Sequence, residues 1–415
     1  MSKRKITIVG AGQAGLQLGI GLVQAGYEVT CVSNRTPEEI RGGRVMSSQC
    51  LFETALVHER ALGINFWDRT CPPVEGIGLS VPHPEIRGAK VIEFAARLEH
   101  PAQSVDQRVK FPRWMEHFAA RGGELRFQDV ALADLEAYAS SSELVVVASG
   151  KGDIAQLFPR DASRSPYDRP MRALALVYVT GMAPRPEYSA VNFNLCPGVG
   201  EYFPVPAETI TGPCDIMVLE GIPGGPMDCW EDVATPDAYL ARAQQILETF
   251  FPWEAERCRA LELTDPNGIL AGRFAPTVRA PIGVLPSGRR VLGLADAVVL
   301  NDPITGQGAG NAAKAAAAYL ASILERGDAP FDAAWMQATF DRAWGDDVGD
   351  VTAWSNALLS PPPQHVLELF GAACSNAKIA HRFVNGFEQP SDFKRWFMTP
   401  EGAQAYLREV AAGGA

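Results

Sequence analysis

The feature that most constrains this chain is a glycine run near its start. Gly10, Gly12 and Gly15 have the spacing G-x-G-x-x-G and stand between an apolar segment, 6–9, and an apolar stretch with helical character. In such a run the first glycine permits a tight turn, the second lets a pyrophosphate approach the backbone, and the third lets the helix pack on the strand. A second apolar segment at 27–32 completes the pattern. The sequence therefore predicts a βαβ unit that binds a dinucleotide.

Composition excludes several other classes of protein. The net charge is −11 with no basic tract, which argues against nucleic acid or an anionic membrane as a partner. The eight cysteines are scattered without a C-x-x-C pair, and no histidine pair has metal-ligand spacing. No apolar stretch approaches the length of a membrane span, and the chain starts without an apolar signal region. We expect a reduced, cytoplasmic protein without a bound metal.

The apolar pattern divides the chain into four parts. Residues 1–165 and 290–325 read as two pieces of the dinucleotide-binding domain, since short apolar strands alternate with helices there. Residues 166–289 contain β-type segments between Pro and Gly clusters, which predicts an inserted, mostly antiparallel sheet for the substrate. Residues 326–415 are mainly helical in pattern, and the proline-rich stretch 34–100 is expected to be irregular.

A second cofactor motif lies at residues 293–311. A strand that ends at Asp296 can hold a ribityl hydroxyl, and the glycine-rich turn before the next helix can direct N–H dipoles at the pyrimidine end of a flavin. NAD has nothing for this second motif to bind, so the pair of motifs favours FAD. The predicted fold is α/β: a Rossmann-type FAD-binding domain with an inserted, mostly antiparallel β-sheet substrate domain and a helical C-terminal region.

As a set, these motifs resemble the flavin-dependent aromatic monooxygenases of the p-hydroxybenzoate hydroxylase fold, and within them the oxygenase components of styrene and indole monooxygenases. The resemblance covers essentially the whole chain and rests on Ser33–Arg35, Gly43-Arg44, Asp106–Arg108, Val147–Lys151 and Asp302–Gly308. The cofactor-binding residues that it implies are Gly10, Gly12, Gln13, Ala14, Gly15, Ser33, Asn34, Arg35, Arg44, Arg108, Val130, Gly150, Asp296, Pro303, Gly306, Gly308, Ala309, Gly310 and Asn311.

The chain departs from the family pattern in three places. Neutral Asn34 stands where an acidic residue often binds the adenosine ribose, so we expect that ribose to be held weakly. The usual Gly-Asp pair is Ala295-Asp296, and residues 148–152 lack the Asp-Gly motif that serves FAD and NAD(P)H in single-component hydroxylases. In the resembled family a separate NADH-dependent flavin reductase supplies reduced FAD. The resemblance implies the same partner here, and it leaves open whether the chain forms a homodimer.

The resemblance also implies a reaction in which reduced FAD and O2 form a C4a-hydroperoxide that epoxidises an electron-rich double bond. Arg44 and Pro303 are candidate catalytic residues because of their expected places beside the flavin. Ser47 and Gln49 join them from the segment after Arg44. Gln49 can exchange a hydrogen bond with the N–H of indole, which styrene lacks; leaving that amide unpaired costs about 1–3 kcal/mol.

The family resemblance also implies which residues line the substrate pocket. Styrene-type members carry Asn, Val and His where this chain has Ser47, Gln49 and Leu51. They carry Tyr and His where it has Val74 and Ile77, so the chain resembles the indole-type subgroup. On a later strand, either Phe193 or the two residues beside it face the flavin, because side chains alternate along a strand. The pocket candidates are Leu51, Val74, Ile77, Asn192, Phe193 and Asn194.

The sequence therefore predicts an oxygenase that epoxidises indole, with styrene and aryl sulfides as side substrates. A true styrene monooxygenase remains the alternative, followed by another flavin-dependent aromatic hydroxylase. A flavin halogenase is disfavoured, because the Trp-x-Trp-x-Ile motif and the tunnel lysine of that class are absent. A non-catalytic FAD-binding escort protein also uses this fold, and it would form no product with any reductase.

Overall fold

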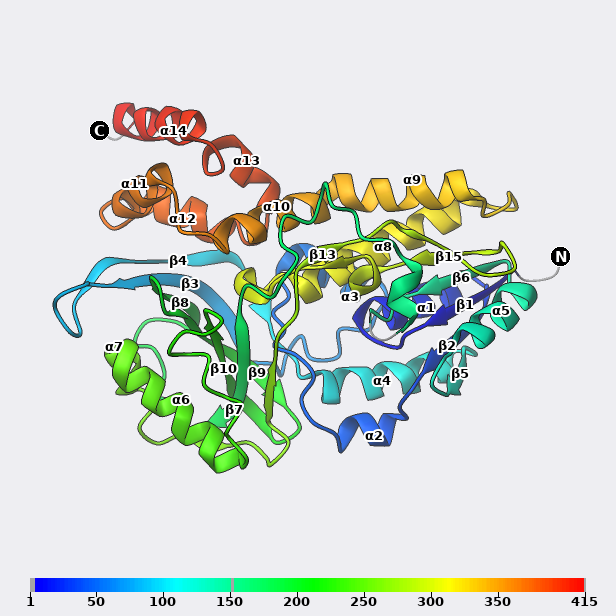
Figure 1. The fold of residues 1–415 in the computed structure, drawn as a ribbon, viewed down its shortest axis with the longest axis horizontal. Coiled ribbons are helices and arrows are strands. Elements are labelled where there is room, and N and C mark those ends of the chain that lie inside the picture. Colours follow the sequence, from blue (N-terminus) through cyan, green and yellow to red (C-terminus); the bar gives the residue numbers. More distant parts are fainter. Residues whose placement is uncertain (1–3, 151–152, 414–415) are drawn as a thin grey trace.

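The computed structural model describes residues 4–150 and 153–413, and two sheets organise them (Figure 1). The first sheet has six strands in the order β14 (Ile282–Val284), β15 (Arg290–Gly293), β6 (Leu144–Val147), β1 (Lys5–Val9), β2 (Glu28–Ser33) and β5 (Glu124–Phe127). Apart from antiparallel β14, neighbouring strands are parallel. All four residues of β6 are buried, as expected for a parallel strand covered on both faces.

Helices surround this first sheet, some packed on its strands and others packed on those helices. They are α1 (Gln13–Gln24), α2 (Pro37–Arg41), α3 (Glu53–Ala61), α4 (Gln107–Ala120), α5 (Leu132–Ser141), α8 (Gly308–Arg326) and α9 (Ala333–Ala343). Helix α1 packs closely on α8 and α4 because Gly21 faces Leu320 and Gly19 faces Phe118 without a side chain between them. The predicted βαβ unit and the return strand at 290–294 are confirmed.

The second sheet has eight strands, in the order β11 (Glu262–Leu263), β7 (Ala173–Thr180), β10 (Gly212–Gly221), β9 (Gly200–Thr209), β8 (Ala190–Cys196), β3 (Pro73–Pro82) and β4 (Lys90–Gln103), with β12 (Ile269–Gly272) also paired to β7. Only β3 and β8 run parallel. The predicted strands at 173–179, 189–195 and 216–219 and the helix at 236–250 are confirmed, whereas β9 was not predicted.

The prediction that residues 34–100 are irregular is wrong. Besides α2 and α3, this stretch holds β3 and most of β4, a long antiparallel pair at the edge of the large sheet. Two physical reasons explain why β3 and β4 were not recognised from the sequence. Gly76 and Gly78 lower the β-propensity of β3, and β4 turns charged side chains to solvent, as edge strands do. The division into 1–165, 166–289, 290–325 and 326–415 stays an interpretation, since β3 and β4 join a sheet made mostly of later residues.

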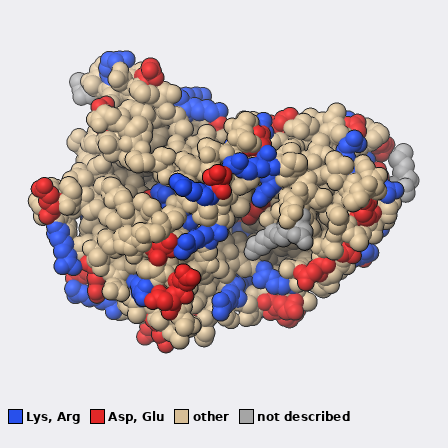
Figure 2. Space-filling model, viewed as in Figure 1, with Lys and Arg blue, Asp and Glu red and all other residues tan. Residues whose placement is uncertain are grey.

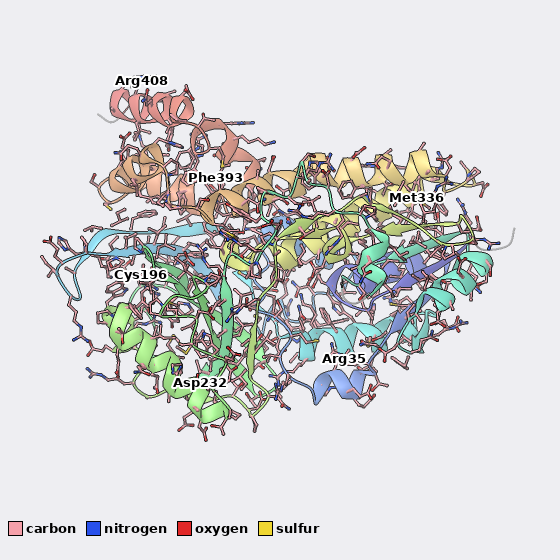
Figure 3. The ribbon with its side chains drawn as sticks, in the orientation of Figure 1. Arg35, Cys196, Asp232, Met336, Phe393 and Arg408 are labelled. Atoms are coloured by element: carbon pink, nitrogen blue, oxygen red, sulfur yellow. The ribbon has the colours of Figure 1, made fainter. Side chains whose placement is uncertain are left out.

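Two layers of helices enclose the large sheet (Figure 1). On one face lie α6 (Pro236–Phe250) and α7 (Pro252–Ala255). On the other lie α10 (Gly349–Leu358), α11 (Gln364–Ala373), α12 (Ala377–Asn385), α13 (Phe393–Trp396) and α14 (Pro400–Ala412). Phe393 lies within this C-terminal layer, in an aromatic core that includes Trp354 and Phe387 (Figure 3). Shorter elements are η1 (Asp153–Leu157), η2 (Ala295–Ala297), η3 (Pro303–Thr305), a π-helical turn η4 (Trp344–Val348), η5 (Pro390–Asp392), β13 (Thr277–Val278) and β16 (Val299–Leu300).

Acidic and basic side chains are interspersed over the face shown in Figure 2. Within residues 4–150 and 153–413, no helix is both long enough and apolar enough to cross a membrane. The same residues contain no cluster of three or more His, Cys, Asp or Glu side chains suited to a metal ion.

One backbone position carries strain that a substitution can test. Ala295 has φ +52, and it is the one residue other than glycine with positive φ in the described part of the chain. An alanine in the left-handed conformation costs about 1–2 kcal/mol. Replacement by glycine removes this strain, but the greater flexibility of glycine in the unfolded chain offsets about 0.5–1 kcal/mol of the stability gained. We expect Ala295→Gly to raise the free energy of unfolding in urea by up to about 1 kcal/mol. Ala295→Val should lower it by about 1–3 kcal/mol. A glycine variant less stable than the parent would contradict this reading.

Candidate functional site

The glycine run sits where three backbone segments meet at the carboxyl end of the first sheet. Gly10 has φ +116, and a Cβ there would lie 2.8 Å from the carbonyl carbon of Ala148, just after β6. A Cβ on Gly15 would lie 1.9 Å from the carbonyl oxygen of Gly10. Both positions therefore need glycine for packing. A Cβ on Gly12 would meet no atom within 4 Å, so its backbone faces open space where a phosphate can approach.

The second motif lies against the loop after β6 at this edge. A Cβ on Gly150 would lie 2.5 Å from the carbonyl oxygen of Asp296, because β15 pairs with β6 and brings the two loops together. Gly306, with φ +66, and Gly308 face open space at the start of α8. The two glycine-rich turns predicted from sequence thus converge on one edge of the sheet.

Asn311 in the first turn of α8 has a side-chain amide without a protein partner. It is 7% exposed, and both its amide nitrogen and its amide oxygen are buried without a hydrogen bond. Leaving such a group unpaired costs about 1–3 kcal/mol, which a bound molecule removes by supplying the missing partners. The open backbone at Gly12, Gly306 and Gly308 and the unpaired amide together fit FAD: the N-terminus of α1 would hold a pyrophosphate, and that of α8 would face the flavin ring.

The turn before α8 is held from both sides. The carboxylate of Asp302 accepts the N–H of Ile304 at 3.2 Å, which starts η3 at Pro303. Thr305 and Ser355 of α10 share a hydrogen bond of 2.7 Å between their hydroxyls. Gln307 donates from Nε2 to the carbonyl of Phe387 at 2.8 Å. The C-terminal helices therefore fix the turn that carries Pro303, a role that the sequence did not reveal.

The loop after β2 presents a polar edge. Asn34 is exposed, and the Ser33 hydroxyl accepts the N–H of Arg35 at 3.1 Å. Arg35, on the α2 side of the molecule (Figure 3), lies 2.6 Å from the sulfur of Met46 through its guanidinium. Arg44 is also exposed. The prediction that Asn34 and Arg44 face a ligand is compatible with their exposure.

Arg108, predicted to bind the cofactor, is fully buried and its guanidinium is occupied by protein groups. It donates to Asp106 and to both oxygens of Asp265 at 2.9 Å, and to the Thr209 hydroxyl at 3.2 Å. It also reaches the carbonyl of Gly43 at 3.4 Å. The side chain therefore positions the loop before Arg44, and its guanidinium already has partners within the protein.

The other predicted cofactor residues contribute backbone or packing. The Gln13 side chain turns inward and donates to the Glu59 carboxylate at 2.9 Å, so its amide is already paired within the protein. Ala14 is buried in the core of the first sheet, and Val130 packs against that core. The Cβ of Gly310 would meet only the Gln307 side chain, at 3.6 Å. Lys151 and Gly152 lie outside the described residues.

A buried tyrosine organises the segment that carries Ser47 and Gln49. Tyr178 of β7 donates its hydroxyl to the carbonyl of Ser47 at 2.8 Å and accepts Nε2 of Gln49 at 3.3 Å. Burial raises the pKa of Tyr178 well above its ordinary value, so its proton stays in place. Gln49 is 4% exposed, and its Oε1 has no hydrogen-bond partner. Tyr178 was not predicted as a site residue. The one sign of such a role in the sequence is a polar hydroxyl inside an otherwise apolar strand.

The predicted pocket residues separate onto two faces of the large sheet. Val74, Ile77 and Phe193 belong to the core between the sheet and the C-terminal helices, and Phe193 packs on Phe203 with ring centroids 4.7 Å apart. Leu51 packs on Ala309 and Ala313 of α8.

Asn192 and Asn194 point to the opposite face. Asn194 accepts the indole N–H of Trp253 at 2.7 Å, and Asn192 donates to Glu254 at 3.2 Å, both partners being on α7. The alternation of side chains along β8 left open which face of the sheet is the pocket face. Phe193 lies on the face that carries Tyr178. The two asparagines therefore lie on the face opposite Tyr178, in hydrogen bonds with α7.

Comparison with known proteins identifies the family. The chain is 30% identical to the styrene monooxygenase StyA of Pseudomonas fluorescens over 99% of both chains, and 30% identical to StyA of a Pseudomonas species over the same shares. The chain belongs to the styrene monooxygenase StyA family. A family model described as "Styrene monooxygenase A putative substrate binding domain" matches residues 150–257. FAD is accordingly the cofactor of this flavin monooxygenase.

Solved structures show the same fold at low identity. The p-nitrophenol 4-monooxygenase PnpA of Pseudomonas putida aligns with a TM-score of 0.62 at 15% identity, covering 94% of this chain and 99% of that one. The flavin-dependent brominase Bmp2 aligns with a TM-score of 0.61 at 15% identity, covering 98% and 100%. These likenesses confirm the predicted α/β architecture with its inserted sheet and helical C-terminal region.

Two glycine variants separate packing from cofactor binding. Gly12 has φ −96, which alanine adopts freely, and it faces open space. We expect Gly12→Ala to keep the melting temperature within about 2 °C while weakening FAD binding by about 10-fold, a loss of about 1.4 kcal/mol. Gly15→Ala should instead destabilise the apoprotein by about 1–3 kcal/mol, since its Cβ overlaps the backbone. Calorimetry and FAD titration measure both. Unchanged FAD affinity in Gly12→Ala would place the pyrophosphate elsewhere.

Proposed function

We propose that this chain is the oxygenase component of a two-component flavin monooxygenase, and that it epoxidises indole in preference to styrene. One observation carries the substrate preference. Gln49 has a buried carbonyl oxygen without a partner, on the segment that Tyr178 holds in place. An N–H donor on the substrate satisfies that oxygen, and indole supplies one.

Tyr178 decides which end of the Gln49 amide is available. Its hydroxyl already donates to the Ser47 carbonyl, so it serves Gln49 as an acceptor and takes the amide N–H. The Gln49 oxygen is then left as an acceptor for the substrate. Because styrene has no donor, its binding would leave this oxygen unpaired, at a cost of about 1–3 kcal/mol.

The chemistry divides between cofactor and protein. Reduced FAD, when bound, supplies the electrons that activate O2 for transfer of one oxygen atom to the substrate double bond. The residues of the chain bind and orient: Val74, Ile77 and Phe193 offer an apolar face, and Gln49 fixes the heteroatom of the ring. Arg44, Ser47 and Pro303 remain the proposed residues at the flavin. Apolar burial also excludes water, which favours oxygen transfer over loss of peroxide.

A separate NADH-dependent reductase as the source of reduced FAD is part of the proposal. Asn34, at the end of β2, is neutral and exposed, which favours weak holding of the adenosine ribose. Weak holding permits FAD to arrive reduced and to leave oxidised. The missing Asp-Gly motif after β6 supports the same division of labour.

Styrene epoxidation is the alternative, and the composition of the pocket face favours it. Val74, Ile77 and Phe193 are all apolar, so a hydrocarbon is accepted there without a desolvation cost. The curated relatives also carry the name styrene monooxygenase.

Substitution of Gln49 tests the preference. We expect Gln49→Leu to lower kcat/KM for indole by about 5- to 150-fold, which corresponds to the loss of about 1–3 kcal/mol. Styrene should change less than about 3-fold or improve. 1-Methylindole serves as the matched substrate control, because it keeps the ring and removes the N–H. A parent enzyme that prefers styrene, or treats indole and 1-methylindole alike, would contradict the proposal.

The two-component proposal has its own test. Protein mixed with chemically reduced FAD, O2 and indole, without NADH or reductase, should yield oxidised indole in a single turnover. NADH with oxidised FAD and no reductase should yield none. Product from NADH and this chain alone would show that it reduces its own flavin.

A further inference from the structure

Four charged side chains lie buried at one end of the large sheet, beside the turn that carries Pro303. Arg172 precedes β7, Glu201 is on β9, Glu220 is on β10, and Asp302 precedes η3. Glu220 is 0% exposed, Asp302 3%, Arg172 6% and Glu201 9%. We call these four residues the acid cluster. None of them was singled out as a site residue from sequence.

The cluster has one cation for three carboxyl groups. Arg172 donates to both oxygens of Glu201, from Nε at 2.6 Å and from a terminal nitrogen at 2.8 Å, so its charge is already paired. Glu220 is the register partner of Glu201 across the two strands, yet both of its oxygens lack a hydrogen bond. Asp302 accepts one backbone N–H, from Ile304. Burial of two more negative charges beside a neutralised pair is prohibitive, so Glu220 and Asp302 together retain a proton.

The charged groups that act on Glu220 support this protonation state. Burial raises the pKa of Glu220 well above its ordinary value, and the charges of Asp302 and Glu201 raise it further against the opposing effect of Arg172. Burial also raises the pKa of Asp302 to about 6, against the Ile304 N–H and Arg172, which lower it. Glu220 is the more deeply buried of the two acids and both its oxygens lack a hydrogen bond, so burial favours its protonated form more strongly than that of Asp302.

The acid cluster shares a sheet face with the proposed pocket. Glu220 alternates with Val218 and Ile216 along β10, and Glu201 with Phe203 along β9, so these side chains point the same way. That face also carries Tyr178, the partner of Gln49. Asp302 is joined directly to Pro303. The cluster therefore connects the pocket face of the sheet with the turn assigned to the flavin.

We propose that Glu220 and Asp302 form an acid pair that stores the proton consumed in each turnover. This inference rests on the proposed oxygenase function. Insertion of one oxygen atom consumes one proton: FADH⁻ + O2 + S + H⁺ → FAD + SO + H2O, where S is the substrate. Two electrons from the flavin and two from the substrate double bond reduce O2; one atom joins the substrate and the other leaves as water. Asp302 passes the proton on at the Pro303 turn, Glu220 replenishes Asp302, and solvent recharges the pair when oxidised FAD leaves.

The first test needs neither flavin nor substrate. A carboxyl whose pKa is raised on folding stabilises the native state below its unfolded pKa and loses that contribution as pH rises through its folded pKa. Thermal unfolding of the apoprotein between pH 5 and pH 8 should show Glu220→Gln melting above the parent at pH 8, with the gap closing toward pH 5. Glu262→Gln, an exposed acid on the same sheet, is the control and should match the parent. A Glu220→Gln variant less stable than the parent at every pH would overturn the proposal.

The second test separates proton supply from structure. With supplied reduced FAD and saturating indole, Glu220→Gln and Asp302→Asn should lower the rate of product formation by about 100-fold, in the range typical of a lost general acid, with H2O2 released instead. The parent rate should fall at high pH, and the variants should lose that dependence. An unchanged pH profile, or an effect confined to the KM for indole, would overturn the acid role. Absence of product from the parent enzyme itself would instead refute the proposed function.

Discussion

The site depends on direct contact between backbones at the carboxyl end of the six-stranded sheet. Gly15 lies against the Gly10 carbonyl, Gly10 against Ala148, and Gly150 against Asp296. No side chain fits between these segments, so the N-terminal turn, the mid-chain loop and the returning strand meet at one edge. That convergence brings two distant glycine motifs to one edge, and it leaves space beside the backbone of Gly12 and Gly308.

The C-terminal helices complete this arrangement from the other side. Gln307 and Thr305 attach the turn before α8 to Phe387 and Ser355, so the aromatic C-terminal core and the flavin turn form one unit. The large sheet contributes Tyr178, which positions Gln49, and the acid cluster at the end of the same face. The proposed substrate preference and the proposed proton supply thus arise from two ends of one sheet face.

Much of the fold was predictable because its signals are local. The glycine spacing, the fully apolar β6 and the capped helix α6 each specify their structure within a few residues. The hairpin of β3 and β4 escaped notice since edge strands carry charges and glycines. The alternation of side chains along β8 placed Phe193 and its two neighbours on opposite faces of the sheet. Only the contact with α7 shows that the neighbouring asparagines lie on the α7 face.

The residues that sequence reasoning missed act through distant partners. Tyr178 and Glu220 acquire their roles from segments far away in the chain, Ser47 for one and Asp302 for the other. Arg108 was found by motif, but a motif does not reveal that Asp106 and Asp265 occupy its guanidinium. Long-range pairing of this kind leaves no periodic signal.

We propose that the edge formed by the glycine run and the start of α8 binds FAD and favours its reduced form. Anaerobic equilibrium titration of the apoprotein with reduced and with oxidised FAD tests it directly. A flavin ring at the N-terminus of α8 would have the negative charge of its reduced form stabilised by about 1–2 kcal/mol, which predicts about 5- to 30-fold tighter binding of reduced FAD. Equal affinities, or tighter binding of the oxidised form, would contradict the account.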